Sequence, residues 1–270
     1  MTATTTQPTD TRAIQTALRG RFVWYDLVTT DIPAATAFYR KIAGWNTMDS
    51  DMPGGKYQMW LTGSTPDTMI GGSMPVAAGT PPHWMSYVSV PNVDEAARQV
   101  ASLGGRVIAP ARDIPTVGRF AVIADPQGAT LSLFTFSDPR PRGEFAPKMG
   151  EFSWHELMTS DHRAAFAFYS RLVGWEQIRE EDVGQGITYR VFGQRGTQCG
   201  GMFTMTAEMR MPPNWMYYIR VPSVDETVQT VTASGGKVLN GPMDVPGGDR
   251  IVQCMDPQGA MFALHSTKNG

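Results

Sequence analysis

The sequence predicts an α+β fold made of four βαβββ modules, and internal repetition is the main reason. Residues 22–45 return 130 positions later as residues 152–175, with Phe, Trp, Leu, Asp, Phe-Tyr and Gly-Trp at matching places. A second block that starts at Pro81 returns at Pro212, and each copy carries one Asp-Pro-Gln-Gly-Ala segment. Blocks that recur in the same order indicate two copies of one domain.

The repeats also place the domain boundaries. We expect one domain at 21–137 and a second at 151–267. Residues 138–150 combine several prolines with charged residues, which is typical of a linker. Residues 1–20 have neither a basic opening nor an apolar stretch, so they do not resemble a secretion signal, and we expect a disordered leader there.

The first half of the N-terminal copy predicts one strand, one helix and further strands. Phe22–Thr29 is an apolar strand, and Asp31 stands where the N-cap of a helix belongs. Apolar residues follow at helical spacing until Gly44, which ends the helix. We expect strands at 57–61 and near 69–74.

The second half repeats this order. We expect a strand at 85–90, a helix at 94–103, and strands at 106–109, 119–124 and 130–136. The last two strands are joined by the Asp-Pro-Gln-Gly turn. Each half therefore follows the order βαβββ, and the C-terminal copy repeats both halves.

Composition narrows the classes of function. The 23 basic and 25 acidic residues give a net charge of −2, without the basic cluster that nucleic acid or an anionic membrane surface requires. No apolar run reaches the roughly 18 residues of a membrane span. The two cysteines, Cys199 and Cys254, form no disulfide framework, which favours a reducing compartment. We expect a cytoplasmic protein, monomer or homodimer, whose partner is a small molecule.

The repeated motifs resemble those of the vicinal oxygen chelate superfamily. This superfamily includes glyoxalase I, extradiol dioxygenases, fosfomycin-resistance transferases and bleomycin-binding resistance proteins. The residues that carry the resemblance are Thr30-Asp31, Phe38-Tyr39 and Gly44-Trp45, their counterparts Asp161, Phe168-Tyr169 and Gly174-Trp175, and the hairpins at Asp125 and Asp256. The resemblance implies that two modules pair into a cupped mixed sheet with helices outside, and that the cup binds the ligand. This chain then has two cups.

The resemblance also implies where a metal would bind. In metal-using relatives the ligands are a His or Gln seven residues before the Asp at the end of the first strand, its counterpart in the second module, and a carboxylate seven residues after the hairpin Asp. The matching positions here are Trp24, Met85 and Ser132 in the N-terminal copy and Trp154, Met216 and Ala263 in the C-terminal copy. None offers the imidazole or carboxylate that open divalent-metal sites use. We therefore expect no metal cofactor.

Strand alternation predicts what lines the cups instead. Residues two apart share a face, so the candidate lining comprises Trp24, Asp26, Met85, Tyr87, Ser132 and Phe134 in one copy and Trp154, Glu156, Met216, Tyr218, Ala263 and His265 in the other. Such an aromatic and thioether-rich wall with one carboxylate and one phenol suits a flat, largely apolar ligand with one or two polar groups. His155 falls on the opposite face from Glu156.

Structural roles for the same residues stay open. The two tryptophans could fill the cups as core, the tyrosines could serve packing, and Asp26 and Glu156 could satisfy buried donors. Alternatively, Glu156 with His265 could do acid–base chemistry, with Asp26 as the carboxylate of the other copy.

Three functions follow from these alternatives. The first is a metal-independent binding protein of the glyoxalase/bleomycin-resistance type, which takes an apolar or aromatic metabolite in one or both cups. The second is a lyase, isomerase or hydroxylase-like enzyme that uses Glu156 and His265, with or without a divalent metal. The third is a structural pseudo-enzyme whose cups are filled by its own side chains.

Overall fold

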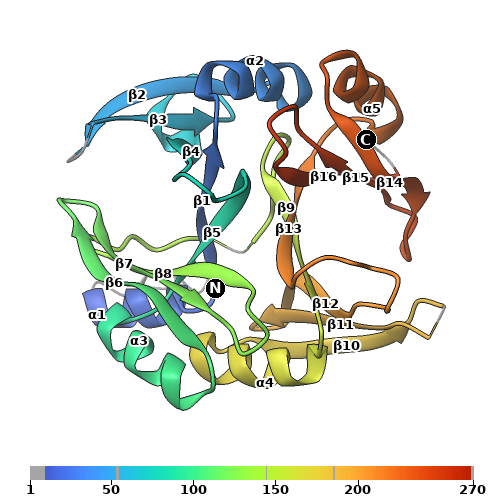
Figure 1. Cartoon of the computed structure of the whole chain (residues 1–270). Coiled ribbons are helices and arrows are strands. Elements are labelled where there is room, and N and C mark those ends of the chain that lie inside the picture. The colour runs from blue at the N-terminus through green and yellow to red at the C-terminus, as the bar shows by residue number, and fades with distance from the viewer. Residues whose placement is uncertain (1–9, 53–54, 144, 185, 269–270) are drawn as a thin grey trace, which may run out of the picture. The chain divides into compact units, whose positions relative to one another are not determined.

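The computed structural model describes residues 10–52, 55–143, 145–184 and 186–268. Its fold is α+β, which confirms the fold class expected from the repeats. Each copy forms one mixed eight-stranded sheet with helices (Figure 1).

The N-terminal copy contributes two modules after a short helix, α1 (Thr11–Leu18). The first module consists of β1 (Phe22–Thr29), α2 (Ile32–Ala43), β2 (Asn46–Met52), β3 (Gly55–Leu61), a single 3-10 turn (Pro66–Thr68) and β4 (Met69–Pro75). The second consists of β5 (His83–Ser89), α3 (Val93–Ser102), β6 (Arg106–Ile114), β7 (Gly118–Ala124) and β8 (Thr130–Phe136).

The C-terminal copy repeats this order. Its first module consists of β9 (Phe152–Thr159), α4 (His162–Val173), β10 (Glu176–Asp182), β11 (Thr188–Gln194) and β12 (Thr197–Thr204). Its second consists of β13 (Asn214–Arg220), α5 (Val224–Ala233), β14 (Lys237–Asp244), β15 (Arg250–Met255) and β16 (Met261–Ser266). The strand orders are β2-β3-β4-β1-β5-β8-β7-β6 and β10-β11-β12-β9-β13-β16-β15-β14, so the two sheets share one topology.

The helix after each first strand begins and ends where the sequence predicts. Asp31 accepts a hydrogen bond from the backbone N–H of Ala34, and Asp161 caps α4 in the same way. These bonds satisfy N–H groups that the first turn of a helix leaves without partners. Gly44 and Gly174 end the two helices at φ of 70° and 79°, a left-handed conformation that glycine adopts without steric cost.

Two parts of the structure correct the sequence analysis. Within the expected disordered leader, Thr11–Leu18 forms α1, which Asp10 caps and which buries Ile14 and Leu18. Their spacing of four residues is a helical signal that the composition of the segment obscured. The strand β2 was also missed, because it lies at the edge of its sheet and its sequence, Asn-Thr-Met-Asp-Ser-Asp-Met, carries no regular apolar alternation.

The contacts of the chain divide it into two compact units, and each unit takes most of one module from each copy. Of the residues that the structure describes, unit 1 contains those in 10–23, 86–145 and 157–214, and unit 2 contains those in 24–85, 146–156 and 215–268. Within unit 1, α3 contacts α4; within unit 2, α2 contacts α5 (Figure 1).

Equivalent hydrogen bonds hold the two modules of each unit together. In unit 2, the hydroxyl of Tyr39 on α2 donates to Asp256 of the hairpin after β15 at 3.1 Å. In unit 1, Tyr169 on α4 donates to Asp125 over the same distance. Both tyrosines are fully buried, so these bonds lie inside the core. The expectation that the Phe-Tyr pairs of these helices belong to the core is confirmed.

Buried indoles add a second pair of equivalent bonds. Trp45 donates from Nε1 to the backbone oxygen of Gly150 in unit 2, and Trp175 donates to that of Gly20 in unit 1, both at 2.7 Å. Trp45 also stacks on Tyr39, with ring centroids 5.4 Å apart. The Gly-Trp motif thus ends a helix and then joins it to the segment that leads into the first strand of the other copy.

Candidate functional site

In the N-terminal copy, aromatic side chains of β5, β7 and β8 gather on one sheet face. Tyr87 is the register partner of Ser132, so the two share this face. The ring of Tyr87 lies 5.7 Å from that of Phe120 and 6.2 Å from that of Phe134. Met85 precedes Tyr87 by two residues on β5 and is also buried. The structure therefore puts these four predicted lining residues on a common face, where each is covered.

Asp26 is the centre of a small polar cluster in unit 2. Its side chain is 2% exposed and accepts hydrogen bonds from Trp24 Nε1 at 3.1 Å and from the hydroxyl of Tyr57 on β3. Trp24 Nε1 also donates to the Tyr57 hydroxyl at 2.7 Å. A β-carbon at Gly72 would lie 2.1 Å from Cζ of Tyr57, so only glycine there leaves room for this ring. Trp24 and Asp26 share a face, as expected.

Glu156 occupies the equivalent strand position in the C-terminal copy and is 6% exposed. Its Oε2 accepts a hydrogen bond from the Tyr218 hydroxyl at 2.9 Å and another from Nε2 of Gln253 at 3.2 Å. Gln253 Nε2 lies 3.2 Å from the Tyr218 hydroxyl as well. Burial, and then the nearby charge of Glu156, raise the pKa of Tyr218 well above its usual value. Tyr218 therefore keeps its proton and acts as a donor.

The remaining predicted residues of this copy lie around Glu156. Ala263 is the register partner of both Tyr218 and Gln253, so its methyl group shares their face. Met216 precedes Tyr218 by two residues and is 1% exposed. Trp154, two residues before Glu156 on β9, is half-buried. The structure thus surrounds a compact group of one carboxylate, one phenol and one amide with apolar atoms.

His265 does not pair with Glu156. Its Nδ1 lies 2.8 Å from Oγ of Ser153, and its Nε2 lies 3.0 Å from Oδ2 of Asp249. Ser153 Oγ also lies 3.3 Å from the backbone oxygen of Tyr218. The expected Glu–His pair is thus replaced by a Ser–His–Asp chain that ends at the backbone of Tyr218. His155 lies elsewhere, buried and 2.5 Å from the hydroxyl of Tyr25.

Four polar residues of these clusters escaped the sequence analysis: Tyr57, Ser153, Asp249 and Gln253. Alignment of the two copies contains a signal for three of them. Gln253, Asp249 and Ser153 stand where the N-terminal copy has Val122, Gly118 and Val23. The signal is a polar residue in one copy where the other copy has an apolar one. The fold that both copies share does not require a polar side chain at such a position.

The donor set at the family's metal positions does not fit a metal. Indole, thioether, hydroxyl and methyl groups stand there, whereas open catalytic sites use imidazole and carboxylate. Among the described residues, no group of three His, Cys, Asp or Glu side chains is close enough to hold an ion. Burial raises the pKa of each of the thiols Cys199 and Cys254 to about 12, so both stay protonated.

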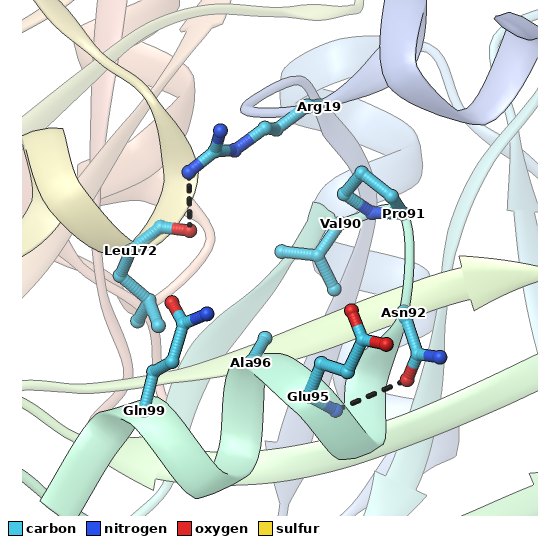
Figure 2. Close-up of a pocket in the computed structure, with 8 residues that line it drawn as sticks. All are labelled: Arg19, Val90, Pro91, Asn92, Glu95, Ala96, Gln99 and Leu172. Carbon is cyan, nitrogen blue, oxygen red and sulfur yellow. Dashed lines mark hydrogen bonds between the residues drawn. The ribbon is translucent and has the colours of Figure 1, made fainter. Parts of the chain in front are cut away.

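Two hollows are lined by residues other than those of these clusters. One, of about 160 Å³, lies in unit 1 over the start of α3, where Arg19 donates to the carbonyl of Leu172 and Asn92 caps the helix (Figure 2). The other, of about 360 Å³, lies in unit 2 beside Arg250 and Lys268. No predicted lining residue borders either hollow. Arg19 also donates to the carbonyl of Arg171, so it is a C-terminal cap of α4.

A family profile described as the Glyoxalase/Bleomycin resistance protein/Dioxygenase superfamily matches residues 21–133 and 151–264. The chain belongs to this superfamily. Its relatives include a protein of Mycobacterium tuberculosis named "Putative glyoxylase CFP32", 35% identical over 89% of this chain and 92% of its own. Another is the anthracycline biosynthesis protein DnrV of Streptomyces peucetius, 29% identical over 93% of this chain and 94% of its own.

Solved structures of the superfamily have the same fold at low sequence identity. The 2,3-dioxygenase LapB from Pseudomonas sp. KL28 superposes with a TM-score of 0.62 at 12% identity, over 92% of this chain and 93% of its own. A Mn(II)-bound glyoxalase from Novosphingobium aromaticivorans gives 0.61 at 15% identity, over 92% and 82%. The described part of this chain contains no helix with the length and apolar character to span a bilayer.

Proposed function

We propose that this superfamily member binds a flat aromatic small molecule at the C-terminal copy, without a metal. The observation that carries the proposal is the buried group of Glu156, Tyr218 and Gln253 on an apolar sheet face. A buried carboxylate with two donors is costly to desolvate, and a ligand that exchanges hydrogen bonds with it would gain both affinity and orientation.

The chemistry of the group favours a ligand with a hydroxyl next to a carbonyl. Tyr218 retains its proton, so its phenol and the amide of Gln253 can donate to a ligand carbonyl. Glu156 can accept the hydrogen bond of a ligand hydroxyl. A ring system with both oxygens on neighbouring positions would use all three side chains. The relative DnrV, named for anthracycline biosynthesis, supports a fused aromatic ligand.

Independence from metal rests on the residue types. The positions that hold the ion in metal-using relatives carry Trp154, Met216 and Ala263 in this copy, and none offers a suitable donor. The name glyoxylase of a 35% identical relative supports an enzyme as second candidate. Its specific basis here is a base and an acid in contact, the Glu156 carboxylate and the Tyr218 phenol.

The test is a titration with 1-hydroxyanthraquinone, followed by quenching of tryptophan fluorescence. We expect saturable binding that survives dialysis against a chelator. Glu156→Gln should weaken binding at least about tenfold, since hydrogen bonds to a buried charge contribute roughly 1.5–3 kcal/mol. The matched control is Asp26→Asn, the same change in the N-terminal copy, which should stay within about twofold of the unchanged chain.

Parent anthraquinone, which lacks the hydroxyl, serves as the ligand control. Its affinity for the unchanged chain should be as low as the affinity of 1-hydroxyanthraquinone for Glu156→Gln. Equal affinity of Glu156→Gln and the unchanged chain would contradict the proposal. Loss of binding after dialysis against the chelator would mean that binding requires a metal ion, as in the metal-dependent members of the superfamily. Absence of any binding would favour the third function, cups filled by the protein's own side chains.

A further inference from the structure

The Ser153–His265–Asp249 chain occurs only in the C-terminal copy. All three hydrogen-bonding side chains belong to unit 2. The equivalent residues of the N-terminal copy are Val23, Phe134 and Gly118, none of which has a side chain that can form such a bond. All three positions thus carry polar side chains in the C-terminal copy, and these side chains bond to one another. Such a connected set indicates a feature with a role of its own rather than unrelated differences at single positions.

Counting protons shows that this chain has two states. Asp249 is a carboxylate, so Nε2 of His265 must carry the proton of their 3.0 Å bond. If Nδ1 is also protonated, it donates to Ser153, whose own proton then points to the carbonyl of Tyr218. If Nδ1 is deprotonated, it becomes an acceptor and competes for the single proton of Ser153.

The distances decide that competition. Ser153 Oγ is 2.8 Å from Nδ1 and 3.3 Å from the Tyr218 carbonyl oxygen. The shorter contact is the stronger hydrogen bond, so loss of the Nδ1 proton turns the hydroxyl away from the backbone of Tyr218. Only the imidazolium form therefore satisfies every contact in the chain at once.

We propose that protonation of His265 regulates ligand binding at the Glu156–Tyr218–Gln253 group through Ser153. In the imidazolium state the hydroxyl of Ser153 holds β13 at the carbonyl of Tyr218 and fixes the phenol that contacts the ligand. In the neutral state the hydroxyl of Ser153 no longer bonds to this carbonyl, and ligand binding weakens. Ser153, His265 and Asp249 are positioning residues in this scheme, which rests on the proposed function.

The other charged groups near His265 come from three elements. Asp249 precedes β15 and faces Nε2 directly. Arg220 is the register partner of His265 on β13, and its Nη1 donates to the backbone oxygen of Pro147 at 2.9 Å. Lys268 follows β16, with its side chain packed over Gly248. Of these three groups, Asp249 is the one in hydrogen-bond contact with the imidazole.

The experiment measures the affinity for 1-hydroxyanthraquinone between pH 5 and pH 8, where histidine ordinarily titrates. The phenol of this probe is neutral throughout that range, as phenols ordinarily are, so the probe itself does not titrate. We expect affinity to fall about fivefold as His265 loses its proton, which corresponds to about 1 kcal/mol, the value of one hydrogen bond.

Two variants distinguish regulation by His265 from a purely structural role of these side chains. We expect one variant to keep high ligand affinity at every pH and the other to keep low affinity. The double variant His265→Phe/Asp249→Gly recreates the N-terminal pair and removes the competitor for the Ser153 proton, so it should bind as the acid form does at every pH. Ser153→Ala should bind as the alkaline form does at every pH. His83→Gln, in the other copy, is the control and should keep the full pH profile.

A ligand-free readout makes the inference independent of the probe. In the unchanged chain the carbonyl carbon resonance of Tyr218 should shift with the same midpoint as the imidazole resonances of His265, and the double variant should show no such shift. A Tyr218 resonance that ignores the titration of His265 would overturn the inference even if the probe binds. If the probe fails to bind but the coupled shift is present, the proposed function fails, whereas the coupling of His265 to the backbone of Tyr218 is supported.

Discussion

In the N-terminal copy the phenyl ring of Phe134 lies against Gly118, whereas in the C-terminal copy the imidazole at the equivalent position bonds Asp249. The carboxylates of the two copies differ in a similar way. Glu156 accepts from Gln253, but the N-terminal copy has Val122 at that place, which offers no hydrogen bond.

Other equivalent residues have kept their partners. Arg119 pairs with Asp94 and Asp113, and Arg250 pairs with Asp225 and Asp244. The buried tyrosine-to-aspartate bonds occur in both units at equal distance. The scaffold contacts are thus the same in both copies, while at four positions of the sheet region the second copy has a polar residue where the first has an apolar residue or glycine. This contrast identifies the residues by which the chemistry of the two copies differs.

The largest expected effect comes from exchanging the residue at the centre of the contrast. Phe134→His should lower the free energy of unfolding by about 3 kcal/mol, because it removes a buried ring and places an imidazole beside Gly118 and Val23, which cannot bond it. His265→Phe should lower it by about 1 kcal/mol, since the ring it adds is apolar and Asp249 is partly exposed. Urea denaturation followed by circular dichroism measures both.

Equal losses of stability from the two exchanges would mean that the environments of residues 134 and 265 are alike. The conservative change Phe134→Leu is the control for lost volume and should cost less than Phe134→His.

A smaller effect is expected at the residue beneath the ring. Gly118→Ala should destabilise the chain by about 2 kcal/mol, because its β-carbon would lie 2.5 Å from Cζ of Phe134 and 2.3 Å from the carbonyl oxygen of Thr135. At the equivalent position Asp249→Ala keeps the existing β-carbon and should cost under about 1 kcal/mol. Thermal denaturation of the two variants gives the comparison, and similar shifts in Tm would contradict it.

The smallest effect concerns a feature that both copies share. Burial raises the pKa of Asp125 and of Asp256, so each carboxyl binds its proton more tightly in the folded chain than in the unfolded one. Above the pKa of the folded chain each carboxyl is charged, and its burial lowers the stability by the full amount. As pH falls through that pKa, the carboxyl binds a proton and this loss of stability disappears.

Asp125→Asn and Asp256→Asn remove that charge, so each variant should lose stability relative to the unchanged chain as pH falls from 7 to 4. The change should be under about 1 kcal/mol and the same for both variants. Urea midpoints at the two pH values measure it. A pH response in only one variant would show that the scaffolds of the copies have also diverged.

Most of the fold could be predicted because the helix caps, the apolar strands and the turn motif each occur in both copies. Asp31 and Gly44 gave the limits of α2, and their repetition at Asp161 and Gly174 made the assignment independent of any single cap. The strand β2 was missed because an edge strand with solvent on most of its surface needs no alternation of apolar residues.

The candidate site could be predicted only in part. Alternation along β9 and β13 correctly put Glu156 and Tyr218 on one face, and their hydrogen bond follows from that. The partners of His265 could not be found in this way, because Ser153 and Asp249 come from other elements and register alone does not determine which side chain an imidazole meets. The metal-ligand positions rest on sequence counts, and the residue types there remain the argument against a metal.

Each compact unit combines helices of both copies, so that α2 contacts α5 in unit 2 and α3 contacts α4 in unit 1. The linker between the copies is then a covalent tether that keeps two interdependent partners at high effective concentration. Removing one copy would take from each unit one of these contacting helices, so the remaining copy would lose part of the packing of its core. Duplication in this arrangement frees one sheet face to change while it makes the backbone of both copies indispensable.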